Sequence, residues 1–139
     1  MFGNVNIVSL GKPNQWKTLS SSDWTAMAVS AADETLFGGA VAMTGRDDRY
    51  LIMVTNTHET DAATVTVKAG NAFQSTGKDV TLSLAAGATA YIQVESGRFK
   101  CATTDAPMSA NITGGNALDK VFLTASAATV KACVLYLAL

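Results

Sequence analysis

The sequence contains few charged residues, two cysteines, two prolines, a single histidine and no long apolar run. Charged residues make up 15% of the 139 positions, well below the usual quarter of a globular chain. Basic and acidic residues are scattered and leave a formal net charge of −1. Because no basic stripe could follow a phosphate backbone, we expect no binding to nucleic acid. No apolar run approaches the roughly 18 residues of a membrane span, so we expect no membrane partner.

The first residues also lack a signal-peptide pattern, because no basic region precedes an apolar stretch. Synthesis in a reducing cytoplasm is therefore the default expectation. Two cysteines in a chain of this size do not make a disulfide framework. We expect Cys101 and Cys133 to be buried or half-buried free thiols, with a disulfide between them as the alternative.

Residue patterns typical of catalysis or metal binding are missing as well. The single histidine, His58, cannot supply a multi-histidine zinc site, and neither cysteine has another ligand nearby in sequence. A pair of His58 and Asp61 could assist a serine, but the strand-to-helix turn that usually presents such a serine is absent. The segment from Gly70 to Lys78 differs from a phosphate-binding loop in its glycine spacing. We therefore predict no catalytic residue, no metal site and no cofactor, and a protein that is not an enzyme.

The sequence is rich instead in short alternating segments of apolar and polar residues. Strict alternation occurs at Ala63–Lys68, Val80–Leu84 and Ala90–Val94, the pattern of strands with one face on a core and the other in water. Tyr50–Val54 is apolar on both faces and suits a central strand. Seven or eight such strands, about ten residues apart and without a convincing helix, predict an all-β fold. We expect an antiparallel β-sandwich, either Ig-like or a small barrel.

Segments between these strands are harder to assign. The pair Gly38–Gly39 favours a bulge or a wide loop, and residues 101–116 read as a long surface loop. Lys120–Thr124 and Thr129–Leu137 are interpreted as a closing hairpin. The last strand is apolar on both sides at its end, where Leu135 and Leu137 lie opposite the main apolar face. Such a strand would promote aggregation unless it is central or covered by a neighbour.

Residues 1–22 differ from the rest and are predicted to form an extended N-terminal arm, followed by the sandwich domain at 23–139. Asn4, Asn6 and Pro13 break any long element, yet the segment is too apolar for a solvated tail. Two interpretations stay open. The arm is either an edge strand folded back on its own domain or a segment that docks on another subunit.

Two parts of the chain resemble small head decoration proteins of tailed bacteriophages, which are encoded beside the major capsid protein. The resemblance covers about residues 50–100 and 119–138, in the runs VTNTHETDAATVTVKAGNAFQSTGKDVTLSLAAGATAYIQVESGRFK and KVFLTASAATVKACVLYLAL. Its features are the strand and turn ATVTVKAGN, the turn LAAGATA, the segment ESGRFK and the apolar terminal strand. It implies a non-enzymatic β-sandwich made in the host cytoplasm that binds the outside of an icosahedral head and stabilises the capsid lattice.

The resemblance also implies partners and interface residues. The major capsid protein is the expected partner, together with self-association, for which a trimer would suit a three-fold site. We expect Phe2, Ile7 and Trp16 to anchor the arm, and Leu135 and Leu137 to pack against a sister subunit or the shell. The alternative is another virion β-module, either a tail or fibre component or a module that binds host glycans.

Overall fold

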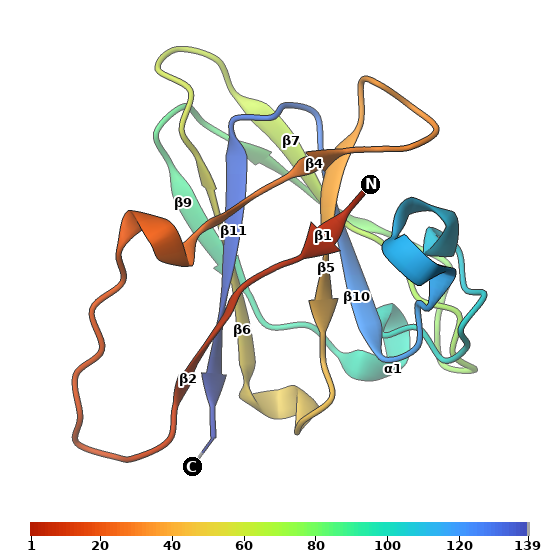
Figure 1. The fold of residues 1–139 in the computed structure, drawn as a ribbon, viewed down its shortest axis with the longest axis horizontal. Coiled ribbons are helices and arrows are strands. Elements are labelled where there is room, and N and C mark those ends of the chain that lie inside the picture. Colours follow the sequence, from red (N-terminus) through yellow and green to blue (C-terminus); the bar gives the residue numbers. More distant parts are fainter. Residues whose placement is uncertain (139) are drawn as a thin grey trace.

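In a computed structural model, which describes residues 1–138, the chain forms two β-sheets packed face to face (Figure 1). The strands of the first sheet are β1 (Gly3–Asn4), β4 (Ala28–Val29), β5 (Phe37–Ala42), β7 (Ala63–Val67), β8 (Val80–Leu84) and β10 (Lys120–Ala125). Those of the second sheet are β2 (Ile7–Leu10), β3 (Thr25–Ala26), β6 (Tyr50–Asn56), β9 (Thr89–Ile92) and β11 (Val130–Leu137). The predicted all-β sandwich is confirmed.

Helical turns are short and lie between the strands. They are η1 (Ser21–Asp23), η2 (Asp47–Arg49), α1 (Ser96–Phe99), η3 (Ser109–Asn111) and η4 (Thr113–Gly115). The order of the first sheet is β1-β5-β10-β7-β8, with β4 also paired to β5. The order of the second is β2-β11-β6-β9, with β3 also paired to β11.

The inner faces of the two sheets form the main core. Every second residue of β6 and β7 is buried, as the alternation predicts, because successive side chains of a strand point to opposite faces. Ile52, Val65, Leu123 and Val134 are typical members of this core, each at most 4% exposed. Burial of these branched and aliphatic side chains is the main source of the sandwich's stability.

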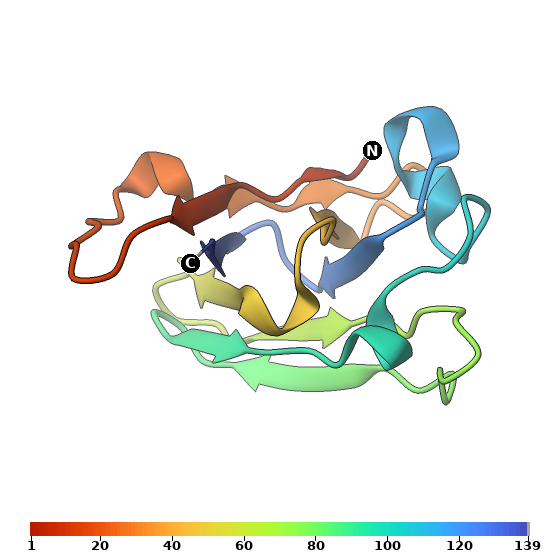
Figure 2. The ribbon, with the colours of Figure 1, turned by 90° about the horizontal axis from the view of Figure 1, so that it is seen from below.

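The first ten residues join the two sheets along one side of the sandwich. β1 pairs in parallel with β5, and β2 pairs in parallel with β11, so the segment crosses from one sheet to the other (Figure 2). β3 and β4 cross back in the same region. Both sheets are therefore mixed rather than purely antiparallel. Within residues 1–10 the fold matches the interpretation of a strand folded back on its own domain, while the predicted boundary at residue 22 stays a prediction.

The predictions of a closing hairpin and of a surface loop at residues 101–116 were wrong. β10 and β11 do not form a hairpin, because β10 pairs with β5 and β7 whereas β11 pairs with β6. The segment that follows residue 100 is not simply a surface loop either. Its side chains form a second core with the N-terminus and with β5 and β10, made of Phe2, Ala40, Cys101, Ala106, Ile112, Ala117 and Phe122.

An ion pair ties the start of β8 to the end of β7. The Nζ of Lys68 lies 2.6 Å from Oδ2 of Asp79, and the backbone N–H of Ala69 donates to Oδ1 at 2.7 Å. Burial opposes ionisation of this carboxyl group, but the hydrogen bonds from Lys68 and Ala69 and the lysine charge outweigh it, so the pKa of Asp79 is lowered. Because the carboxylate is the favoured form in the folded state, its contribution to stability is complete above the unfolded-state pKa of about 3.9.

We expect Asp79→Asn to lower the free energy of unfolding at pH 7 by about 0.2–1 kcal/mol, as is typical of a partly exposed pair. The difference from the wild type should vanish as the pH falls through the lowered pKa of Asp79, because the wild-type carboxyl group is then protonated. Urea unfolding at pH 7 and at a series of decreasing pH values measures both. A difference that stays constant through the whole series would rule out this linkage.

Candidate functional site

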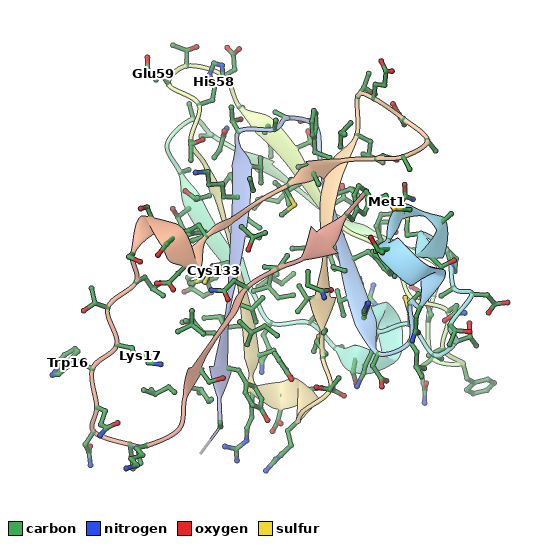
Figure 3. All side chains as sticks on the ribbon, viewed as in Figure 1. Met1, Trp16, Lys17, His58, Glu59 and Cys133 are labelled. Atoms are coloured by element: carbon green, nitrogen blue, oxygen red, sulfur yellow. The ribbon has the colours of Figure 1, made fainter. Side chains whose placement is uncertain are left out.

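The side chain of His58 forms hydrogen bonds with the backbone of its own loop, between β6 and β7. Nδ1 of His58 accepts hydrogen bonds from the N–H groups of Thr60 and Asp61, at 3.1 and 2.8 Å. Its Nε2 lies 3.6 Å from the Asp61 carboxylate. The ring therefore holds a turn between β6 and β7, at the end of the sandwich where Figure 3 places His58 and Glu59. Among residues 1–138, no group of three or more His, Cys, Asp or Glu side chains could hold a metal ion.

Both cysteines are free thiols and both are buried, as expected. Burial raises the pKa of Cys101, and burial together with the negative charge of Asp23 raises the pKa of Cys133. A thiol held in this protonated form is a poor nucleophile. We therefore assign these cysteines to packing.

The outer face of the second sheet is unusually apolar. In β11 the residues Val130, Ala132 and Val134 belong to the core, so the alternating residues Leu135 and Leu137 point outward. The register carries this face across the neighbouring strands, since Leu135 lies beside both Val8 and Leu51. We call this face the outer patch, made of Val8, Leu10, Leu51, Met53, Tyr91, Leu135 and Leu137.

The outer patch contains a groove. It has a volume of about 250 Å³ and is lined by Asp48, Arg49, Tyr50, Leu51, Gln93, Leu135 and Leu137. Hydrogen bonds fix its polar rim. Gln93 donates to the carbonyl of Asp48 at 2.6 Å, and Arg49 donates to the carbonyl of Leu137 at 3.3 Å. An apolar floor with a fixed polar rim is the usual anatomy of a protein-binding surface.

A loop with an exposed tryptophan adjoins the outer patch. It spans residues 11–20 and continues directly from β2, the edge strand of the same sheet. Trp16 is 100% exposed and projects from the outer side of this loop, far from β10 and α1 (Figure 3). Lys17 turns back instead and donates to the carbonyl of Ser9 at 2.9 Å. A fully exposed tryptophan is large, rigid and apolar, which makes it suited to anchor a partner.

The five interface residues predicted from the sequence divide into two groups. Phe2 is 3% exposed and packs in the second core, and its N–H donates to the carbonyl of Asn111 at 2.6 Å. Ile7 packs against the main core. Both residues are thus occupied within their own chain, because β1 and β2 are strands of the sandwich. Trp16, Leu135 and Leu137 lie where a partner can reach them, with Leu137 44% and Leu135 partly exposed.

The sequence analysis does not assign Val8, Leu10, Leu51 and Met53 of the outer patch to an interface. Val8 and Leu10 belong to the segment predicted to be an arm, and Leu51 and Met53 to the strand predicted to be central. The signal was present in β6, because a strand that is apolar on both faces needs cover on its outer side as well.

Among the described residues no helix is long and apolar enough to cross a membrane. Comparison of the chain with protein-family models, with curated proteins and with solved structures finds no match.

Proposed function

We propose that this protein is a non-enzymatic structural component of a bacteriophage virion, which binds the outer surface of the head and stabilises the capsid lattice. The observation that carries the proposal is the outer patch with the adjoining Trp16 loop. Outward residues of a β-sandwich are ordinarily polar, so an outward face of leucine, valine, methionine and tyrosine is a surface made to be covered.

The size of this surface suits a protein partner rather than a small molecule. A large aromatic side chain buries about 150–250 Å², and Trp16 and Tyr91 are 100% and 76% exposed. Together with the aliphatic residues around Leu137, they provide much of the 800 Å² or so that each partner contributes to a standard interface. The low charge of the chain favours the same interpretation, and the strand and turn segments at residues 50–100 and 119–138 supply the resemblance to head decoration proteins. The major capsid protein is the proposed partner.

Co-sedimentation with expanded, empty heads of the phage that encodes the chain tests the proposal. The wild-type protein should bind saturably. Trp16→Ser and Leu137→Ser should each weaken binding by about 30-fold or more, the effect of losing a residue worth about 2 kcal/mol at an interface. Because both side chains are exposed, neither change should alter the unfolding temperature. Deleting residues 1–22 is a poorer test, since it removes β1 and β2 from the two sheets.

Phe73→Ser provides the matched control. Phe73 is also an aromatic residue that is 100% exposed on a loop, but it lies between β7 and β8 in the other sheet. Its replacement should leave binding to heads unchanged. Equal losses for the Trp16 and Phe73 variants, or no binding of the wild type to heads, would contradict the proposal. Binding to host-cell glycans in place of heads would favour a tail, fibre or glycan-binding module.

A further inference from the structure

The sandwich is closed on one side and open on the other. Residues 1–10 bridge the sheets on the closed side, and β8 and β9 border the opposite side (Figure 2). β8 pairs with β7 and β9 pairs with β6, whereas β8 and β9 follow each other in the chain without pairing in the described structure. Each therefore leaves one edge of its sheet without a neighbouring strand among residues 1–138.

The hydrogen bonds of β7 show which groups of β8 face this open edge. The carbonyl of Thr64 accepts from Ser126, and the N–H of Lys68 donates to Phe122, so these alternate residues of β7 point toward β10. Residues 65 and 67 must then bond to their β8 partners, residues 82 and 80. By alternation, the N–H and C=O groups of Thr81 and Ser83 point away from β7 into the open edge.

Packing at this edge is incomplete. Leu82 lies opposite the core residue Val65 and so faces the core, yet it is 41% exposed. Beside it an apolar cavity of about 50 Å³ reaches between the sheets as far as Ile52 and Leu123. Edge strands of soluble proteins are usually protected by a charge, a proline or a bulge. The β8 sequence Val-Thr-Leu-Ser-Leu contains no charged residue and no proline.

We propose that β8 pairs antiparallel with β8 of a second copy of this chain, about a twofold axis at Leu82. In this register Thr81 of one copy lies opposite Ser83 of the other, and these are the residues whose backbone groups face the edge. The two pairs can form four hydrogen bonds. Leu82 then lies opposite Leu82 of the second copy in a non-hydrogen-bonded pair, in which side chains approach most closely.

The absence of charge on β8 also favours a second copy of the chain as the partner at the open edge. Self-pairing places each side chain against the same strand, so a charged edge would repel itself, and this edge carries no charge. The nearest charged residues, Lys78 and Asp79, would lie opposite the uncharged Ala86 and Ala85 of the second copy. Apolar positions of β8 meet apolar positions and hydroxyl residues meet hydroxyl residues. In this register the strand is complementary to itself over all five residues.

The small area of the contact between the two β8 strands sets the affinity that we expect for the dimer. Five residues from each copy bury less than the 1,200 Å² or so of stable complexes, so the dimer belongs to the weak class. We expect a monomer–dimer equilibrium with a Kd of roughly 0.1–1 mM, and a larger fraction of dimer where copies are concentrated side by side. The pairing uses a different surface from the outer patch and does not depend on the proposed function.

Sedimentation equilibrium of three proteins at concentrations up to about 2 mM tests the register. The wild type should dimerise. Thr81→Lys/Ser83→Lys should lower the association constant at least tenfold, because two pairs of lysines then lie directly opposite each other. Thr81→Lys/Ser83→Glu should restore dimerisation to at least the wild-type level, because each introduced lysine then faces an introduced glutamate of the second copy. In urea unfolding at concentrations well below the expected Kd, where the proteins are monomers, the two variants should share one midpoint, since both positions are exposed and both variants lose the same hydroxyl contact between Thr81 and Thr66.

A wild-type protein that stays monomeric throughout this range would overturn the proposal, as would double-lysine and lysine–glutamate variants that dimerise equally. Crosslinking gives a second measurement. Cα atoms of a non-hydrogen-bonded pair are about 4.5 Å apart, within the reach of a disulfide. Oxidised Leu82→Cys should therefore form covalent dimers several times faster than Ser126→Cys, an exposed control at a turn. Equal rates for the two variants would also overturn the proposal.

Discussion

Replacing Asn56 with alanine is expected to lower the free energy of unfolding by about 3–5 kcal/mol. Asn56 is fully buried, and its amide makes four hydrogen bonds. Its Nδ2 donates to the carbonyls of Asp61 and Leu84, at 2.9 and 3.2 Å. Its Oδ1 accepts from the N–H of His58 and the hydroxyl of Thr129, at 3.1 and 2.9 Å. The Asn56 side chain thus joins three connections at the same end of the sandwich, namely the β6–β7 loop, the end of β8 and the turn before β11. Alanine removes the hydrogen bond of each of the four partners.

Urea unfolding of the wild type and of the Asn56→Ala variant measures this loss. Thr129→Val is the matched control, because it removes one of the four hydrogen bonds and retains the size of the side chain. We expect it to cost about 1 kcal/mol. If Asn56→Ala cost no more than Thr129→Val, water would be replacing the amide, and the three connections would not depend on it.

The positions of the middle strands could be predicted from the sequence because alternation is a local property. Val80–Leu84 coincides with β8, and Ala63–Lys68 and Ala90–Val94 overlap β7 and β9. Pairing is not local. Period-two alternation states which face of a strand is buried but not which strand lies beside it. The connection from β10 to β11 crosses between the sheets, and a short turn of this kind has the same composition as a hairpin turn.

The candidate site was predictable only in part, for the same reason. Leu135 and Leu137 stand out because the end of the last strand is apolar on both sides. Val8 and Leu10 do not, because Asn4 and Asn6 interrupt the pattern before them. Their outward direction is set by the parallel pairing of β2 with β11, which joins segments more than 120 residues apart. No periodicity within ten residues carries that information.

The glycine pair in β5 shows how a distant contact can decide a local feature. Gly38–Gly39 favoured a bulge or a wide loop, yet both residues lie within a regular strand. A Cβ atom on Gly38 would lie 2.5 Å from the carbonyl oxygen of Leu123 and 2.6 Å from the ring of Phe2. One on Gly39 would lie 2.9 Å from a methyl group of Val5. The two glycines leave the space in which the N-terminal segment packs across β5, so the pair is required by residues 2–5 rather than by a turn.

Gly38→Ala is therefore expected to lower the free energy of unfolding by about 3 kcal/mol, near the upper end of the usual cost of overpacking. The ring of Phe2 can move, but the carbonyl of Leu123 belongs to the neighbouring strand β10, so relief requires β5 and β10 to separate. Thermal or urea unfolding measures the loss, and Gly3→Ala is the control, because a Cβ at Gly3 meets no atom within 4 Å. The control should change stability by no more than about 0.5 kcal/mol.

A double variant separates the two conflicts at Gly38. Phe2→Ala alone should cost about 3–5 kcal/mol, the usual loss for a buried phenylalanine. Combined with Gly38→Ala it should cost less than the sum of the single changes, because the ring that the new methyl group meets is already gone. Strict additivity would mean that the methyl group conflicts with the backbone of β10 alone. A Gly38→Ala protein as stable as the wild type would mean that neither the ring of Phe2 nor the carbonyl of Leu123 lies close enough to Gly38 to meet the methyl group.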